Sequence, residues 1–182
     1  MPSFDRRPIP RMSLRVVIAA LVLLVSSRAW AEAPPTVLWS TSFNAGDYSN
    51  AWGVAQGPDG QPVVAGYSCA VGTSDCAVRA IKYDSTDGSV IWNVRYQSSG
   101  GDDGAEAVAI GADGHPIVAG ASCDVHYGNC TLRLIKLDGT TGAILWNVAN
   151  SSGRGSNGAY GVAVGPATGP GGHRLAGGTA SR

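Results

Sequence analysis

The sequence lacks helical periodicity. Beyond residue 31, no window keeps apolar residues at i, i+3 and i+4 over three turns, which argues against an amphipathic helical fold. Phenylalanine is also scarce, with 2 among 182 residues, whereas glycine occurs 26 times. Valine, isoleucine, alanine and tryptophan therefore carry the apolar content. This mixture is typical of many short strands joined by tight turns.

Catalytic motifs are absent as well. The sequence has no H-E-x-x-H, no G-x-S-x-G, no Walker phosphate loop and no EF-hand loop, so it shows none of the signatures of these enzyme and calcium-binding classes. The glycine-rich stretch 167–173 lengthens a hairpin and does not join a strand to a helix, so it is not a phosphate loop. We therefore predict no catalytic residue, no cofactor and no metal ion.

Basic charge is lacking outside the N-terminus. Residues 1–31 hold five of the 13 basic and one of the 13 acidic residues, so eight basic and twelve acidic ones remain, a formal net charge of −4. Such a chain offers no basic patch for phosphate groups, which argues against nucleic acid as a partner.

Residues 1–31 have the features of a signal peptide. Arginines precede an apolar run at 16–25 that is too short to cross a bilayer, and Ala29 and Ala31 place small residues where a signal peptidase cleaves. We expect cleavage after Ala31 and a secreted or periplasmic protein with no membrane span. Met12 is an alternative start, because a complete short signal follows it, and a membrane anchor is the alternative role of the apolar run.

The chain contains an internal repeat of 54 residues. Residues 51–69 align without gaps with 105–123, and a third copy at 159–181 aligns after a four-residue insertion. The section that follows, 76–96, aligns with 130–150. A period of this length is typical of stacked supersecondary units.

Each repeat is expected to form four antiparallel strands. In the second copy we predict strands at 105–111, 116–122, 131–137 and 143–149, with an Asp-Gly turn after the first. The third of these strands is apolar on both faces. We therefore expect neighbouring sheets to cover both of its faces.

One recurring segment carries a family resemblance. The stretches "YDSTDGSVIW" (83–92) and "LDGTTGAILW" (137–146) place Asp, Gly and Trp at the same offsets. The second resembles the tryptophan-docking motif of quinoprotein-like β-propellers, and the repeats are similar to those of bacterial secreted seven-bladed propeller proteins. The resemblance covers most of residues 36–181. It implies an all-β fold, a partial β-propeller of repeated four-stranded antiparallel blades, about two and a half in number.

On this interpretation, residues 1–31 are the signal peptide and residues 32–182 an incomplete propeller. The propeller parts are an orphan strand at 36–43, a first blade at 51–97, a second blade at 105–149 and half of a third blade at 159–181. In the family, the N-terminal strand completes the final blade, and four to eight blades close a ring. We therefore expect the chain to be the front portion of a longer propeller.

The docking motif assigns structural roles to a recurring set of residues. Tryptophan would fill the wedge between adjacent blades while its N–H reaches a carbonyl. Glycine would adopt a turn conformation that is costly for other residues, and aspartate would hydrogen-bond the turn backbone. The expected docking residues are Trp39, Trp92, Trp146, Gly88, Gly142, Asp84 and Asp138.

The four cysteines recur at the same place in each repeat. Four cysteines allow three pairings, and the repeat favours one of them. The expected disulfides are Cys69–Cys76 and Cys123–Cys130, each bracketing the loop between the second and third strands. A metal site is the alternative, because Asp124 and His126 lie in the second loop, but the first loop has no histidine.

Two further polar groups invite a functional interpretation. Asp102 and Asp103 lie in a glycine-rich connection where paired carboxylates can bind calcium, although solvated turn residues are the commoner explanation. His115 and His173 share one repeat position, where the first copy has Gln61. Recurrence beside a turn favours a structural role for this position.

The sequence thus predicts an exported, non-enzymatic β-propeller repeat protein that acts as a scaffold or binding module for an unidentified ligand. Expected partners are a second copy or a chain that completes the propeller. A fragment of a quinone-dependent (PQQ-type) dehydrogenase is one alternative. Members of that family bind the quinone beside adjacent cysteines, and no two cysteines adjoin here. An outer-membrane assembly scaffold is another alternative.

Overall fold

The computed structural model describes residues 36–44, 48–73, 75–98, 101–124, 129–151 and 157–165, and the backbone of 175–179. The predicted signal peptide lies outside the described residues. The chain divides into two compact units, Met1–Val37 and Leu38–Arg182, and the strands that the structure describes belong to the second. Within the described ranges, no helix is long and apolar enough to cross a membrane.

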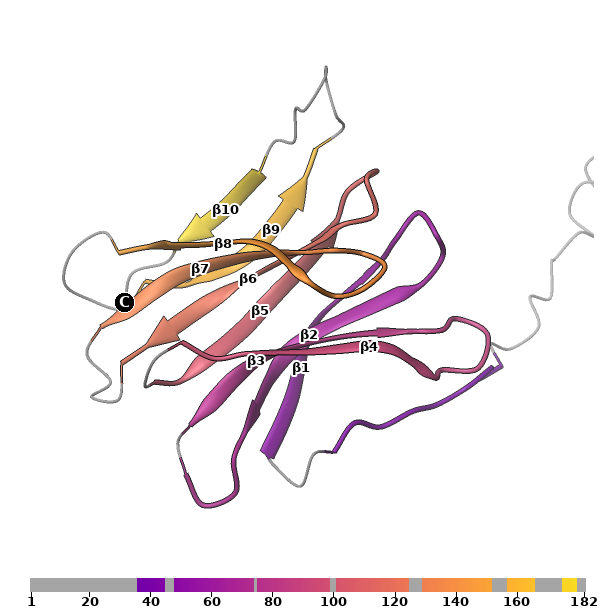
Figure 1. Cartoon of the computed structure of the whole chain (residues 1–182), viewed down its shortest axis with the longest axis horizontal. Coiled ribbons are helices and arrows are strands. Elements are labelled where there is room, and N and C mark those ends of the chain that lie inside the picture. Colours follow the sequence, from indigo (N-terminus) through magenta and orange to yellow (C-terminus); the bar gives the residue numbers. More distant parts are fainter. Residues whose placement is uncertain are drawn as a thin grey trace, which may run out of the picture. The chain divides into compact units, whose positions relative to one another are not determined.

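The described strands form three antiparallel sheets (Figure 1). Sheet A consists of β1 (Tyr48–Gln56), β2 (Pro62–Cys69), β3 (Cys76–Tyr83) and β4 (Val90–Tyr96). Sheet B consists of β5 (Asp103–Ile110), β6 (Pro116–Cys123), β7 (Cys130–Leu137) and β8 (Ile144–Asn150). The third sheet pairs β9 (Ala159–Val164) with β10 (Leu175–Thr179). The all-β prediction is confirmed, and the described sheets do not close into a ring.

Sheets A and B repeat each other in register as well as in strand order. The first strand of each sheet carries a register shift at the same repeat position, between Ala51 and Gly53 in β1 and between Ala105 and Ala107 in β5. The pairing of β3 with β4 shifts after Lys82, and the pairing of β7 with β8 shifts at the equivalent residue. The sequence repeat is therefore also a structural repeat.

The main core lies between the two four-stranded sheets. Alternation along the strands places Val63, Ala65, Val78 and Ala80 on one face of sheet A, where they are buried with Trp92. Sheet B contributes Ala105, Val108, Val118, Ile135 and Leu137 to the same cluster. On its other face, sheet B contacts β9 through β5 and β6, where Ile117 and Ala119 are buried.

Residues 36–44 form no strand, unlike the expected strand at 36–43. Among the described residues, no strand pairs with this segment, so it has no partner with which to form a ladder. Its side chains nevertheless contact sheet A, as described below.

Candidate binding face on the first sheet

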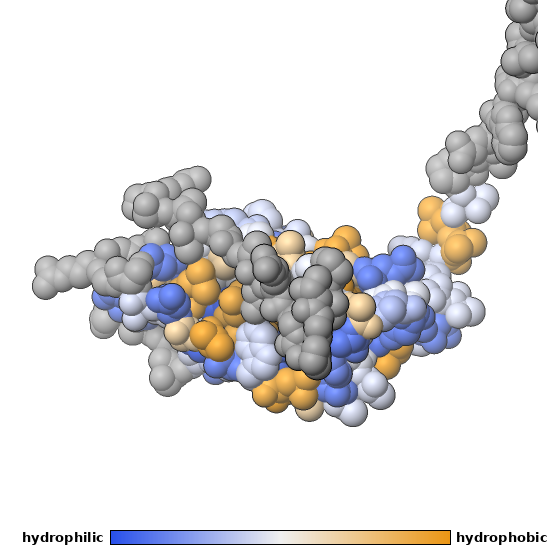
Figure 2. Space-filling view, turned by 90° about the horizontal axis from the view of Figure 1, so that it is seen from above, coloured by the Kyte–Doolittle hydropathy of each residue, from blue (hydrophilic) through white to orange (hydrophobic). Residues whose placement is uncertain are grey.

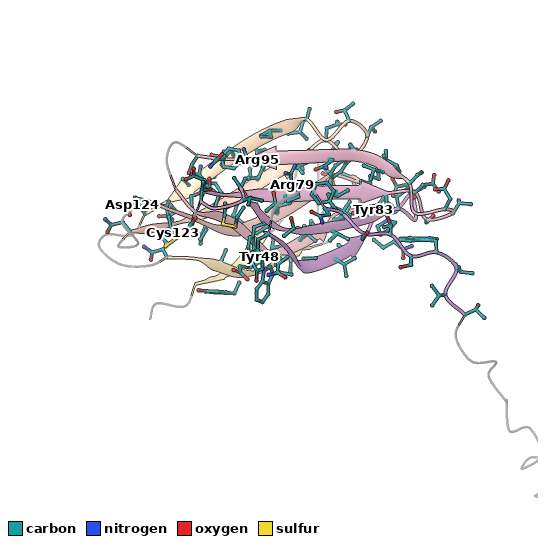
Figure 3. All side chains as sticks on the ribbon, turned by 90° about the horizontal axis from the view of Figure 1, so that it is seen from below. Tyr48, Arg79, Tyr83, Arg95, Cys123 and Asp124 are labelled. Carbon is teal, nitrogen blue, oxygen red and sulfur yellow. A yellow bond between two sulfur atoms is a disulfide. The ribbon has the colours of Figure 1, made fainter. Side chains whose placement is uncertain are left out.

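The face of sheet A that points away from sheet B is hollowed. A cavity of about 400 Å³, here called the sheet A hollow, lies between the segment 39–43 and strands β1, β2 and β3. Its walls are largely apolar and include Val64, Ile81 and Tyr83, with Arg79 as a polar group. Arg79 and Tyr83 both extend from β3 (Figure 3). Burial raises the pKa of the Tyr83 phenol. Elsewhere on the surface, exposed hydrophobic residues lie in patches between hydrophilic ones (Figure 2).

Trp39 covers one end of this face. Its Nε1 donates a hydrogen bond to the carbonyl oxygen of Ser85 at 2.8 Å, and its ring lies 6.4 Å from that of Tyr83 between centroids. Gly88 takes a positive φ of 74° beneath the ring, and a Cβ on Gly88 would lie 2.6 Å from Trp39 Cε3. Only glycine fits this turn without displacing the indole.

Trp92 makes the same contacts one repeat later. Its Nε1 donates to the carbonyl oxygen of Gly139 at 3.2 Å, and a Cβ on Gly142 would lie 3.1 Å from the indole. The φ of Gly142 is 75°. The structure therefore brings together four of the sequence-predicted docking residues in two equivalent pairs. Among the described residues, Trp146 donates no hydrogen bond, and it is half-buried.

The two predicted turn aspartates hydrogen-bond the backbone of their own turns. The Asp84 carboxylate accepts from the N–H of Thr86 at 2.7 Å, and Asp138 accepts from the N–H of Thr140 and of Thr141. These bonds to the charged form, with one from the Thr141 hydroxyl, lower the pKa of Asp138 below its usual value.

Two arginines repeat in the same manner, although sequence reasoning did not single them out. The Arg79 guanidinium carbon lies 5.0 Å from the centroid of the Phe43 ring, and that of Arg133 lies 5.3 Å from the centroid of Tyr96. Each arginine also donates to a serine and an asparagine of its own sheet, Ser68 and Asn93 or Ser122 and Asn147. The recurrence of arginine at one repeat offset was the signal that could have found them.

Two lysines also link the strands to the turns. Lys82, 6% exposed, donates from Nζ to Asp59 Oδ2 and to the carbonyl oxygen of Gly139, both at 2.6 Å. Partial burial raises the pKa of Asp59, but the hydrogen bonds from Lys82 and from the backbone N–H of Gln61, together with the charge of Lys82, leave the pKa below its usual value. Lys136 pairs with Asp113 at 2.7 Å in the same way.

The cysteines pair within their hairpins. Disulfides join Cys69 to Cys76 and Cys123 to Cys130, and each pair lies directly opposite in the strand register. Such bonds are typical of proteins that fold in an oxidising, extracellular type of compartment. His126, which the metal alternative requires, lies outside the described residues. Within the described ranges, no cluster of three or more His, Cys, Asp or Glu side chains has the geometry for a metal ion.

Asp102 and Asp103 serve the connection between the two sheets. Asp103 is 1% exposed, and its carboxylate accepts hydrogen bonds from the backbone N–H and hydroxyl of Ser98. The Asp102 carboxylate accepts from the N–H of Cys76 at 3.4 Å, and its carbonyl accepts from the N–H of Cys123. These contacts give both residues a structural role at this place in the chain.

The position shared by Gln61 and His115 has a structural role in both sheets. Gln61 Oε1 accepts from the N–H of Ser85 at 2.6 Å, and His115 Nδ1 accepts from the N–H of Gly139 at 3.1 Å. His173 lies outside the described residues.

Comparison with known proteins adds no family assignment. No protein-family model matches the chain, and no curated protein matches it in sequence.

Proposed function

We propose that the chain is part of an exported, non-enzymatic β-propeller repeat protein, in which sheets A and B are successive blades. In this proposal another β-sheet packs against the sheet A hollow, and the protein acts as a scaffold or binding module.

A repeated docking contact carries this proposal. Trp92 and Tyr96, both on β4, contact sheet B through an indole hydrogen bond and an arginine stacked on the ring. Trp39 and Phe43 make the same two kinds of contact with sheet A. The segment 39–43 therefore occupies the place that the last strand of a preceding blade would occupy. Three further strands would lie beside it in that blade, and the sheet A hollow lies where they would pack.

The partner that fits this face is a β-sheet with small apolar side chains. On sheet B, the equivalents of Val64 and Ile81 are Val118 and Ile135, each 2% exposed beneath sheet A. The residues that cover them from sheet A are mainly valine and alanine. A second copy of the chain, or another chain that completes the propeller, would supply such a surface.

Mutation of the hollow tests the proposal. The chain released by an exporting host is expected to self-associate or to bind a hydrophobic dye, because an uncovered apolar sheet face recruits partners. Val64→Arg, in the hollow, should reduce both signals. Val71→Arg is the matched control, because Val71 is 75% exposed in a hairpin loop and does not line the hollow. Size-exclusion chromatography with light scattering measures the outcome. A dye-silent monomer that neither substitution changes would contradict the proposal.

The dehydrogenase alternative gains no support from the described residues, whose four cysteines all form disulfides within hairpins.

A further inference from the structure

One peptide group lies at the junction of the two four-stranded sheets. The carbonyl oxygen of Gly139, in the turn between β7 and β8, accepts hydrogen bonds from two side chains of sheet A, Trp92 Nε1 at 3.2 Å and Lys82 Nζ at 2.6 Å. This carbonyl is therefore one point at which sheet A is attached to sheet B.

The backbone N–H of Gly139 contacts a histidine of the same sheet. The N–H of Gly139 donates to His115 Nδ1 at 3.1 Å, so both polar groups of this residue are used. Gly139 is buried, and a Cβ at this position would lie 2.0 Å from the carbonyl oxygen of Gly114. The contact with His115 is thus part of a tightly packed turn that has little room to adjust.

The equivalent junction on sheet A uses a group that does not titrate. The carbonyl oxygen of Ser85 accepts from Trp39 Nε1 at 2.8 Å, and the N–H of Ser85 donates to Gln61 Oε1 at 2.6 Å. In both junctions an indole N–H donates to a turn carbonyl, and the N–H of the same turn residue donates to a side chain. The Gly139 carbonyl also accepts from Lys82. The two junctions differ as well in the side chain that accepts from the turn N–H, which offers an amide oxygen in sheet A and an imidazole nitrogen in sheet B.

Protonation changes what the imidazole can do. The neutral ring of His115 accepts through the Nδ1 lone pair, whereas in the cation both ring nitrogens carry hydrogen and neither can accept. A carboxylate lies close enough to pair with the cation, because Asp138 Oδ2 is 4.0 Å from the same Nδ1. A proton on Nδ1 would therefore favour Asp138 and leave the N–H of Gly139 facing a donor.

Other charged groups around this junction are already engaged. Asp113 accepts from the backbone N–H of His115 through Oδ1 at 3.2 Å and from Lys136 through Oδ2 at 2.7 Å. On the sheet A side, the Lys82 ammonium that reaches the Gly139 carbonyl is paired with Asp59. Asp138 is thus the carboxylate placed to receive the protonated ring.

We propose that His115 makes the docking of sheet A on sheet B sensitive to pH. Histidine changes charge between roughly pH 5 and 8, the range that separates neutral from acidified compartments. Acidification moves Nδ1 from the N–H of Gly139 to Asp138 and loosens the peptide on which Trp92 and Lys82 rest. The junction of Trp39 with sheet A keeps its contacts, because Gln61 does not titrate. This inference does not depend on the proposed function.

Nuclear magnetic resonance on the full ¹⁵N-labelled chain tests the proposal. Between about pH 7.5 and about pH 5, the hydrogen-exchange protection factor of the Gly139 amide should fall by about fivefold, the size expected for one hydrogen bond. The indole N–H signal of Trp92 should shift over the same range. The Ser85 amide and the indole of Trp39 serve as internal controls and should not change. A Gly139 amide and a Trp92 indole that are insensitive to pH would overturn the proposal.

Exchanging the two acceptors makes the test sharper. His115→Gln should remove the pH response of Gly139 and Trp92, and the counterpart Gln61 shows that glutamine fits this place in the repeat. The reciprocal Gln61→His should transfer the response to Ser85 and Trp39. The unchanged signal of the other junction in each variant reports that the sheets remain folded. A pH response of Gly139 that persists in His115→Gln would overturn the assignment to His115.

Discussion

Sheets A and B share strand order, register and turn chemistry, but their equivalent faces have different surroundings. On sheet B, Val118 and Ile135 lie under a complete sheet and are each 2% exposed. On sheet A, the equivalent Val64 is half-buried beside a hollow and Ile81 is 4% exposed, and among the described residues the segment 39–43 lies over this face. Trp39 nonetheless docks on sheet A as Trp92 docks on sheet B. The docking contact therefore needs only one four-stranded sheet and one tryptophan from the preceding segment. It does not require the other strands of a covering sheet.

Replacing each tryptophan by alanine should give the largest difference in stability between the two faces. Trp92→Ala deletes an indole that is 7% exposed and should lower the free energy of unfolding by about 3–5 kcal/mol. Trp39→Ala should cost less, because Trp39 is half-buried beside the hollow. Trp52→Ala, at a site that is 59% exposed, is the control with the smallest loss. Urea denaturation measures all three. Equal losses at Trp92 and Trp39 would show that the covering sheet adds nothing to the docking contact.

Alanine substitutions at two turn glycines distinguish the cost of a positive φ from the cost of a clash with the indole. Gly142→Ala places a Cβ both at positive φ and against the Trp92 indole, and should destabilise by about 2–4 kcal/mol. Gly60→Ala is the matched control, because its φ is 77° but nothing lies within 4 Å of the added Cβ. Only the backbone cost of about 1 kcal/mol is expected there. Thermal unfolding of the two variants gives the difference. Similar losses would mean that the indole moves aside at no cost.

The disulfides should contribute equally to the two sheets. Each closes a loop with a sequence separation of 7, so removing either should cost about 2.5 kcal/mol in the chain-entropy account. The double variants Cys69→Ser/Cys76→Ser and Cys123→Ser/Cys130→Ser can be compared by denaturant unfolding under non-reducing conditions. A much larger loss in one sheet would indicate that its hairpin depends on the disulfide for more than loop closure.

Acid should reveal the smallest difference between the sheets. In the turn of sheet B, hydrogen bonds from Thr141 and Thr140 lower the pKa of Asp138, whereas in sheet A the bonds from Ser89 lower the pKa of Asp87, three residues further along the turn. A carboxyl whose pKa is lower in the folded state than in the unfolded state stabilises the fold fully at pH values above its unfolded-state pKa of about 3.9. This stabilisation is lost as the pH falls through the folded-state pKa. Carboxyl ¹³C titration should place both midpoints below 3.9. Asp138→Asn should leave the Asp87 midpoint unchanged, and a shift of that midpoint would mean that the turns are coupled.

Local pattern was sufficient to predict the strands. The sequence predicts a strand at 116–122, and β6 spans Pro116–Cys123, because strand propensity and the flanking Asp-Gly turn are both encoded nearby. The docking glycines were found because turn chemistry repeats with the sequence. The expected strand at 36–43 was wrong, since a strand requires a neighbour that the sequence of the segment does not specify.

The tryptophan contact between the sheets was predictable from the sequence, but the contacts of the lysine and arginine side chains were not. Lys82 reaches the carbonyl of Gly139 across 57 positions of sequence, and its aliphatic and charged ends suit an exposed strand equally well. Arg79 stacks over Phe43, which lies in the same segment as Trp39 and contacts sheet A. Such contacts depend on how two folded units meet, and their only signal in a single sequence is recurrence at one repeat offset.

The placement of each disulfide inside its own hairpin has a kinetic consequence. For a chain that oxidises while it is still unfolded, the correct partner of every thiol is seven positions away, whereas Cys76 and Cys123 are separated by 47. Loop-closure statistics favour the shorter encounter by roughly tenfold or more. The correct bonds should therefore form first, hairpin by hairpin, and this chain should reach its native pairing with little need for a disulfide isomerase.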